Sequence, residues 1–270
     1  MSVSKYYLLD TFSNEPFKGN PTPVCILNEM LSAGVMAKLA REFNSPVTTF
    51  VEPKNKDGSF NIRYFTVEGE IPACGHATLG AAFLLLHHPP LEEVEFVTIE
   101  KVRIKACVHD EMVYLQYPIY ERKNYEIPPE LLHALTIKLP ETHFYCDELK
   151  SLFIELKGPD DVRRIKPDFG RLRKASDELK EVVVMSSSNS SEYDLVLRSF
   201  CPWIGIDEDP VTGSIHSVLA PFWQERTGKN ELTVFQASER SGELFVKITG
   251  DSVKIGGNSR IVVEGQLNSL

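Results

Sequence analysis

The sequence predicts an α+β fold of two pseudo-symmetric lobes, in each of which a mixed sheet is rolled around a central helix. Two observations support this prediction. Residues 75–88 form a helical stretch that is apolar on nearly every side and lies between strand-like segments, and a similar helix start recurs in the second half of the chain. A helix that is apolar all round is buried, and a surrounding sheet is the arrangement that buries it here.

The first half of the chain has the composition and alternation of strands at 5–12, 23–27, 48–51, 60–65, 94–108 and 112–117. A turn-rich stretch, from Ser13 to Pro21, separates the first two strands. Residues 32–43 carry apolar groups at helical spacing, and Ser32 is a plausible N-cap. The central helix, 75–88, follows the fourth strand.

The second half repeats this plan, with strands predicted at 142–146, 152–156, 182–185, 194–200, 231–237, 244–249 and 260–264. A charged helix is predicted near 168–181. The second central helix is predicted over 212–226, because one wide face is apolar and Gly228 is a typical helix end. The strand that ends at Pro118 is followed by a polar segment, so we expect residues 1–118 to form the first lobe and 119–257 the second.

The composition narrows the classes of function. The 270 residues are 42% hydrophobic, which is enough for one large or two medium domains. A net charge of −9 without Lys/Arg blocks argues against nucleic acid as a partner. The longest apolar stretch, near 79–86, is shorter than the roughly 20 residues that cross a bilayer, and no signal peptide is recognisable, so we expect no membrane partner.

The cysteines indicate a reducing compartment. The five are scattered along the chain and no CxxC pair occurs, so neither a zinc site nor a disulfide framework is indicated. We therefore expect a cytoplasmic protein without a metal.

The two central helices begin with related motifs. The first reads EIPACGH, from Glu70 to His76, and the second reads EDPVTGS, from Glu208 to Ser214. In both, a Glu precedes a Gly by five residues with a Pro between them, and an imidazole or hydroxyl follows the Gly. The repetition suggests a duplicated lobe.

These motifs predict carboxylate binding. A helix N-terminus has unpaired N–H groups and a partial positive charge, and a glycine there lets a ligand approach the backbone closely. Two such ends facing one another would bind the carboxylate of a small substrate and stabilise an enolate-like intermediate. Either motif alone could be an ordinary capped helix start; the symmetric pair favours a binding site.

At these residues the chain resembles the phenazine-biosynthesis PhzF-like isomerase family, which is related to diaminopimelate epimerase. The matching pieces, in family order, are DTFSNEPFKGNP (10–21), AREFN with TTF (40–50), IRYFTVEGEIPACGHATLGAA (62–82), RSFCPWIGIDEDPVTGSIHSVLAPFW (198–223) and KIGG (254–257). The resemblance implies a diaminopimelate epimerase-like fold with the active site in the inter-lobe cleft, and a return of residues from about 258 to 270 to the first lobe. It also implies proton transfer on a small carboxylate-bearing substrate without a cofactor or metal, in a homodimer.

The family's site residues carry over to matching positions. Asp209 and His76 would be catalytic, Asp209 as an acid/base or an orienting carboxylate and His76 also holding the substrate. The other substrate-binding residues implied by the resemblance are Asn20, Gly75, Gly213 and Ser214. An imidazole that titrates near neutrality favours a functional His76, whereas Asp209 before Pro210 could be only an acid at a helix start.

One position departs from the family pattern. After the first helix the family reads N-x-S-E-T-x-F with Glu as the principal acid/base, but here Asn44 to Phe50 reads NSPVTTF, so Val47 replaces that Glu. Losing a positioned acid/base costs roughly 10²- to 10⁴-fold in rate. In addition, Cys74 has Thr212 as its counterpart, which disfavours a two-thiol epimerase because a hydroxyl is a far weaker acid than a thiol.

Three interpretations remain. Another carboxylate, Asp209 or Glu208, transfers the proton; or the reaction differs from the usual isomerisation; or the protein binds a small carboxylate without catalysis. The sequence favours an isomerase-like protein with Asp209 as the proton carrier.

Overall fold

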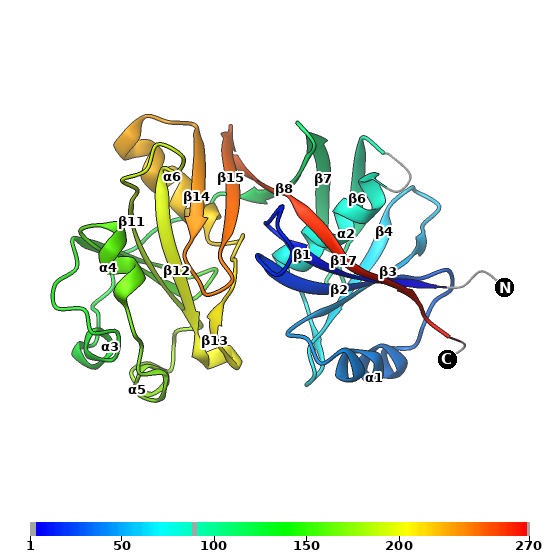
Figure 1. Ribbon diagram of the computed structural model, residues 1–270, viewed down its shortest axis with the longest axis horizontal. Coiled ribbons are helices and arrows are strands. Elements are labelled where there is room, and N and C mark those ends of the chain that lie inside the picture. Colours follow the sequence, from blue (N-terminus) through cyan, green and yellow to red (C-terminus); the bar gives the residue numbers. More distant parts are fainter. Residues whose placement is uncertain (1–3, 88–90, 269–270) are drawn as a thin grey trace. The chain divides into compact units, whose positions relative to one another are not determined.

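The computed structural model describes residues 4–87 and 91–268, and the chain divides into two compact units (Figure 1). The first unit falls within Met1–Gln116 and Ile255–Leu270, and the second is Tyr117–Lys254. The sequence analysis placed these limits at Pro118 and at about residue 258.

The first unit is a mixed sheet built from both ends of the chain. β1 pairs antiparallel with β2 and with β17, β2 pairs parallel with β3, and β4 pairs antiparallel with β3 and parallel with β6. An antiparallel run from β6 through β7 to β8 completes it. The strands are β1 (Lys5–Thr11), β2 (Asn20–Ile26), β3 (Thr48–Lys54), β4 (Phe60–Phe65), β5 (Glu70–Ile71), β6 (Glu93–Val97), β7 (Arg103–His109), β8 (Met112–Pro118) and β17 (Ser259–Gln266).

The central helix of the first unit is α2 (Gly75–His87), and it contacts strands on several sides, namely β1, β2, β3, β6, β7 and β17. Its small residues allow this close packing. A Cβ added at Gly80 would lie 2.9 Å from the Thr22 side chain and 3.2 Å from that of Thr11. The predicted helix 75–88 is confirmed as far as residue 87, and position 88 lies outside the described residues.

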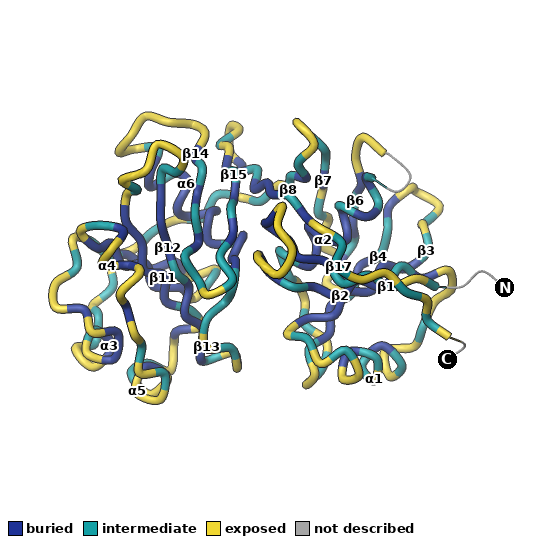
Figure 2. The backbone as a smooth tube through the Cα atoms, viewed as in Figure 1, coloured by how far each residue is buried: buried dark blue, intermediate teal, exposed yellow. Residues whose placement is uncertain are grey.

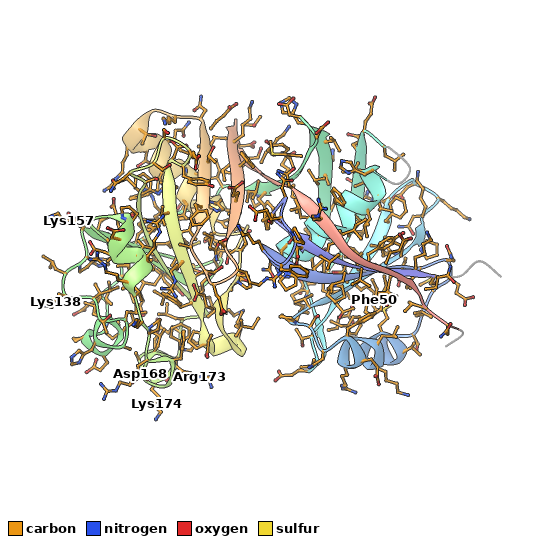
Figure 3. The ribbon with its side chains drawn as sticks, viewed as in Figure 1. Phe50, Lys138, Lys157, Asp168, Arg173 and Lys174 are labelled. Atoms are coloured by element: carbon orange, nitrogen blue, oxygen red, sulfur yellow. The ribbon has the colours of Figure 1, made fainter. Side chains whose placement is uncertain are left out.

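A second helix, α1 (Ala33–Phe43), covers the outer side of the same sheet and alternates between buried and exposed positions (Figure 2). Its N-cap is Ser32, whose Oγ accepts a hydrogen bond from the Val35 N–H at 3.3 Å, as predicted. Its buried face packs on a cluster that includes Phe50, which lies inside the unit in Figure 3.

The second unit has the same plan. β10 pairs antiparallel with β9 and parallel with β11, and β12 pairs antiparallel with β11 and β13 and parallel with β14, which continues antiparallel to β15. The strands are β9 (Thr142–Cys146), β10 (Ser151–Glu155), β11 (Glu181–Ser187), β12 (Leu195–Cys201), β13 (Ile206–Asp209), β14 (Glu231–Gln236), β15 (Gly242–Thr249) and β16 (Ser252–Gly257), the last of which crosses into the first unit.

Alternate residues of these strands face two different layers. Val182, Val184 and Phe200 pack with residues of the short helices α3 (Pro129–Ala134), α4 (Pro159–Arg164) and α5 (Phe169–Lys174). On the opposite face Phe144 stacks on Phe153 at 4.9 Å and contacts Phe222 of α6 (His216–Thr227) at 4.8 Å. The helix α6 is therefore the central helix of this unit.

Two predicted elements differ from those observed. The segment 94–108 is divided into β6 and β7 by a turn in which Lys101 has a φ of 64°. The predicted helix near 168–181 is wrong beyond Lys174, where α5 ends and its charged side chains project outward (Figure 3). The Trp203 indole N–H lies 3.0 Å from Arg173 O inside the helix and 2.8 Å from Ser176 O just after it, and it donates to both carbonyls where the helix ends.

The second central helix also starts later than predicted, at His216 rather than at Thr212. The Thr212 N–H donates to Gln236 Oε1 at 2.9 Å, so the backbone at this residue is held by β14. A tight turn follows, in which the His216 N–H donates to Gly213 O and the Ser217 N–H donates to Ser214 O, both at 3.1 Å. The structure also contains α3, α4, β5, β13 and β16, which the sequence analysis did not predict.

A partly buried carboxyl in the second unit gives a pH-dependent prediction. Glu181 accepts hydrogen bonds from the Ser199 hydroxyl and from the Ser151 hydroxyl, the latter at 2.8 Å, and burial raises the pKa of Glu181 above its ordinary value of 4.5. Above pH 4.5 the unfolded chain releases this proton before the folded chain does. Stability contributed by the neutral carboxyl is therefore present at acid pH and lost as the pH rises through the folded pKa.

The substitution Glu181→Gln keeps the shape and removes the ionisation. We expect its melting temperature at pH 8 to exceed that of the wild type by about 2–4 °C, the shift that corresponds to ~1 kcal/mol in a chain of this size. The difference should vanish near pH 4, and thermal melts of both proteins across this range would measure it. A difference that does not change with pH would show that Glu181 does not titrate as stated.

Candidate active site

Asn20 is buried at the start of β2, and the loop before it is held at several points. The Thr11 hydroxyl donates to Asn20 O at 3.0 Å, and the buried carboxylate of Asp10 accepts from the Phe17 N–H at 2.6 Å. Gly19 has a φ of 70°, and a Cβ added there would lie 2.1 Å from Thr11 O. The position before Asn20 therefore has to be glycine.

Val47 lies immediately before β3 and is 6% exposed. The two residues that follow, Thr48 and Thr49, are fully buried, and their hydroxyls have no hydrogen-bond partner within the described part of the chain. An apolar side chain thus occupies the position where the family pattern has its acid/base.

The start of α2 is anchored from β4. Cys74 O accepts hydrogen bonds from the N–H and the hydroxyl of Thr78, at 3.0 and 2.7 Å, and the Thr78 and Tyr64 hydroxyls lie 2.5 Å apart. His76 is half-buried, with Nδ1 3.5 Å from Cys74 Sγ. Burial lowers the pKa of His76 to about 4. The imidazole is therefore neutral near pH 7, where the sequence analysis expected it to titrate, and it can offer a hydrogen bond but not a positive charge.

The start of α6 holds the predicted proton carrier. Asp209 ends β13, and its Oδ2 accepts from the Thr212 hydroxyl at 2.6 Å. Gln236 of β14 bridges the same turn, because its Nε2 donates to Asp209 O at 2.8 Å while its Oε1 accepts from the Thr212 N–H. Sequence reasoning missed Gln236, since nothing in the pattern of β14 marks its last residue.

The glycine turn follows directly. Gly213 is buried and Ser214 is half-buried. Both carbonyls accept hydrogen bonds from the first turn of α6. The N–H groups of Gly213 and Ser214, in contrast, have no acceptor among residues 4–87 and 91–268. Two backbone donors next to a carboxylate are suited to holding an anionic group close to an acid/base.

The glutamate at the head of each motif is held in the same way in the two units. Glu70 accepts from Arg63 Nε at 2.8 Å and from Nη2 at 2.7 Å, and Glu208 accepts from Arg198 Nε and Nη2, both at 2.8 Å. Such a bidentate arginine–carboxylate pair is a strong charge-assisted interaction. Both oxygens of Glu208 are committed to Arg198, so of the two carboxylates left open by the sequence Asp209 is the better proton carrier.

The equivalence extends to the strands that carry the arginines. Glu70 lies opposite Phe65 in the β4–β5 pair, and Glu208 lies opposite Phe200 in the β12–β13 pair. The Arg63 guanidinium is 5.3 Å from the ring of Phe65, and that of Arg198 is 4.9 Å from the ring of Phe200. The sequence signal was an Arg-x-Phe tripeptide upstream of each motif, which the sequence analysis did not use.

The predicted residues are divided between the units. Asn20, Val47, Gly75 and His76 belong to the first, whereas Asp209, Gly213 and Ser214 belong to the second. Within the second unit the structure brings Asp209 to the start of α6 through Thr212.

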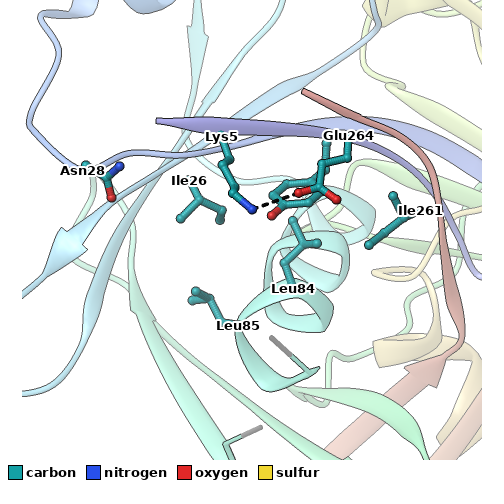
Figure 4. Close-up of a pocket in the computed structure, with 8 residues that line it drawn as sticks. Lys5, Ile26, Asn28, Leu84, Leu85, Ile261 and Glu264 are labelled. Carbon is teal, nitrogen blue, oxygen red and sulfur yellow. Dashed lines mark hydrogen bonds and ion pairs between the residues drawn. The ribbon is translucent and has the colours of Figure 1, made fainter. Parts of the chain in front are cut away.

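Two cavities, one in each unit, are lined by other residues than these. One of about 370 Å³ in the first unit opens beside α2, and its polar side is closed by the ion pair of Lys5 Nζ with Glu264 Oε1 at 2.9 Å (Figure 4). It is lined by Lys5, Tyr7, Ile26, Asn28, Leu84, Leu85, Ile261 and Glu264. Another of about 350 Å³ in the second unit lies between Thr136 and Ile165.

Two classes of feature are missing from the described residues. Within 4–87 and 91–268 no group of three or more His, Cys, Asp or Glu side chains is placed to hold a metal ion. In the same ranges, no helix combines the length and the apolar character needed to cross a membrane.

Comparison with known proteins identifies relatives over nearly the whole chain. The family model of phenazine biosynthesis-like proteins, PhzC-PhzF, matches residues 9–265. The chain is 35% identical over 272 residues to an uncharacterized isomerase of Halalkalibacterium halodurans, with 99% of each chain covered. It is 34% identical over 265 residues to an uncharacterized isomerase of Pseudomonas aeruginosa, with 97% of this chain and 98% of the relative covered.

Solved structures agree with the fold. A PhzF-family protein of Enterococcus faecalis superposes with a TM-score of 0.89 at 34% identity, covering 99% of this chain and 100% of that one. A hydroxyproline epimerase of Agrobacterium vitis, at 10% identity and a TM-score of 0.54, covers 99% of this chain and 91% of its own, and it shares the fold alone. The predicted diaminopimelate epimerase-like α+β fold is confirmed.

Proposed function

Because the chain belongs to the family of phenazine biosynthesis-like proteins, PhzC-PhzF, we propose that it is an isomerase that moves a proton on a small carboxylate-bearing substrate. The observation that carries this proposal is the start of α6. Two backbone N–H groups, of Gly213 and Ser214, lie there without an acceptor in the described residues and next to the carboxylate of Asp209. By the family resemblance, the proposed substrate site also includes Asn20, Gly75 and His76.

In this proposal Asp209 takes a proton from a carbon of the substrate, and the electron pair of the broken C–H bond moves toward the substrate carboxylate. The N–H groups of Gly213 and Ser214 stabilise the negative charge that develops there. The protonated Asp209 then returns the proton at another carbon, so atoms and electrons balance without a cofactor. Neutral His76 contributes a hydrogen bond to the bound substrate.

The second candidate is a protein that binds a small carboxylate without catalysis. Val47 favours it, because a buried valine occupies the family's acid/base position and cannot transfer a proton. A cytoplasmic location, which rests on the scattered cysteines, and a homodimer, which rests on the family resemblance, belong to the proposal as well.

Proton exchange with solvent tests the proposal. Wild type and Val47→Glu are incubated in deuterated buffer with a panel of small amino and unsaturated carboxylates, and NMR follows isomerisation and deuterium uptake. We expect the wild type to exchange at least one panel member and Val47→Glu to raise that rate by roughly 10²-fold, the lower end of what a positioned acid/base contributes. Val47→Gln serves as the matched control, because glutamine has nearly the shape of glutamate but cannot transfer a proton.

The outcomes separate the two candidates. Exchange by the wild type means that the missing Glu is not essential and leaves Asp209 as the leading base. Exchange only by Val47→Glu means that the site binds the substrate but has lost the proton-transfer group, which supports the binding protein.

A further inference from the structure

We propose that the Arg63–Glu70 and Arg198–Glu208 pairs are positioning residues that hold the starts of α2 and α6 in their anion-binding form. This inference rests on the proposed function, since it concerns the same helix starts. The inference goes beyond the proposed function because it gives a role to four residues that would not touch the substrate.

A short stretch of chain connects each glutamate to the glycine of its helix start. Each glutamate lies five residues before the glycine of its motif, with a proline between them. Proline fixes one backbone angle and donates no hydrogen bond, so the short connection transmits the position of the glutamate to the glycine. A shift of Glu70 or Glu208 therefore moves the N–H groups at Gly75 or Gly213.

The backbone hydrogen bonds of β5 and β13 alone hold these glutamates weakly. β5 has only two residues, Glu70 and Ile71, and pairs with β4 at those two positions. β13 has four residues, and its register with β12 shifts between Phe200 and Cys201. With so short a ladder on each side, the side-chain pair adds a restraint where each glutamate lies, upstream of the bonds that Gln236 makes to the α6 turn and Thr78 makes to the α2 start.

The side chains of both arginine pairs are partly shielded from solvent. The side chains of Arg63 and Glu70 are 16% and 24% exposed, and those of Arg198 and Glu208 are 13% and 19% exposed. The Lys5–Glu264 pair, in contrast, has both side chains more than half exposed. Solvent and salt screen a partly shielded pair less than a fully exposed one, so both arginine pairs, and Arg198–Glu208 above all, are screened less than the Lys5–Glu264 pair.

Arg198 has a further contact that fixes its own position. Its Nη1 donates to Ile165 O at 2.7 Å, which connects the pair to the end of α4. The restraint on the α6 start is thus continuous from α4 through Arg198 and Glu208 to the glycine turn.

Titration with crotonate, a small unsaturated carboxylate, tests the inference. NMR follows the amide signals of Gly75, His76, Gly213 and Ser214 in wild type, Glu70→Gln and Glu208→Gln. We expect each substitution to raise the Kd for crotonate about tenfold, because the N–H groups that hold the carboxylate would be displaced; in catalysis a misplacement near 1 Å costs up to ~10²-fold in rate. Before crotonate is added, Glu208→Gln should shift the signals near Gly213 and spare Gly75, and Glu70→Gln should do the opposite.

Two control variants exclude a general loss of stability. Glu264→Gln, which breaks the exposed Lys5 pair, should leave the Kd unchanged. The double exchange Arg198→Glu with Glu208→Arg keeps an ion pair in place and should recover part of the affinity lost in Glu208→Gln.

The possible failures are distinguishable. If crotonate shifts the wild-type signals but the Kd stays constant in both glutamine variants, the pairs only stabilise the fold and the inference is overturned, while the proposed function stands. If crotonate leaves the wild-type signals at both glycines unmoved, carboxylate binding at the helix starts is rejected, and the inference with it.

Discussion

Replacing Asp209 with asparagine is expected to lower turnover by roughly 10²- to 10⁴-fold, the contribution of a positioned acid/base. The amide has the size of the carboxylate but cannot accept a proton from carbon. The fold should be preserved, because the amide oxygen of the new side chain can still accept the Thr212 hydroxyl, which now donates to Asp209 at 2.6 Å, and because the Gln236 bond goes to the backbone of residue 209. The rate of deuterium uptake, together with a melting curve, would measure both effects.

The neighbouring carboxylate supplies the control for this substitution. Asp207 is exposed on the same strand, so Asp207→Asn removes a negative charge close to the site without touching the glycine turn. Its activity should equal that of the wild type. If Asp209→Asn retained full turnover, Asp209 would not be the base, and the proton transfer would have to be assigned elsewhere.

Gly19→Ala is expected to destabilise the protein by about 2–5 kcal/mol. About 1–2 kcal/mol comes from placing an L-residue with a side chain at a φ of 70°. The remainder comes from contact, because the new Cβ would lie 2.1 Å from the carbonyl oxygen of Thr11, and backbone shifts that relieve overpacking cost about 1–3 kcal/mol. Urea unfolding of the purified protein would give the free energy difference.

Gly250→Ala separates the cost of the backbone conformation from the cost of the steric contact. Gly250 has a φ of 62°, but a Cβ added there meets nothing within 4 Å. It should therefore lose only the conformational part, about 1–2 kcal/mol. Equal losses for the two substitutions would contradict the close approach at Gly19, and with it the account of how the loop presents Asn20.

The sequence predicted best those elements that short-range chemistry determines. The helix at 75–87 follows from an unbroken apolar run, and the N-cap at Ser32 follows from a hydroxyl at the right distance from the helix. The wrong predictions depend on partners far away in the chain. Trp203, whose indole caps α5, lies 30 residues beyond Arg173, and Gln236, which holds Thr212 out of α6, lies 24 residues beyond it.

The candidate site shows the same limit. The repeated Glu-x-Pro-x-x-Gly pattern and the replacement at Val47 are legible in the sequence, and both come from local motifs. The arginines that hold Glu70 and Glu208 are found only once the strand pairs align them. The neutral state of His76 is likewise a result of burial, and burial depends on the packing of the whole unit.

The pairing of β1 with β17 has a consequence for biosynthesis. Residues 5–11 leave the ribosome well before one of their two partner strands, 259–266, is made. The second unit is one continuous segment and can fold while translation continues, whereas the first must wait until residues 259–266 have been made. Until then one edge of β1 offers unpaired N–H and C=O groups to other chains. A ribosome that stalls before residue 259 would therefore release a chain with one complete half and one half prone to aggregate.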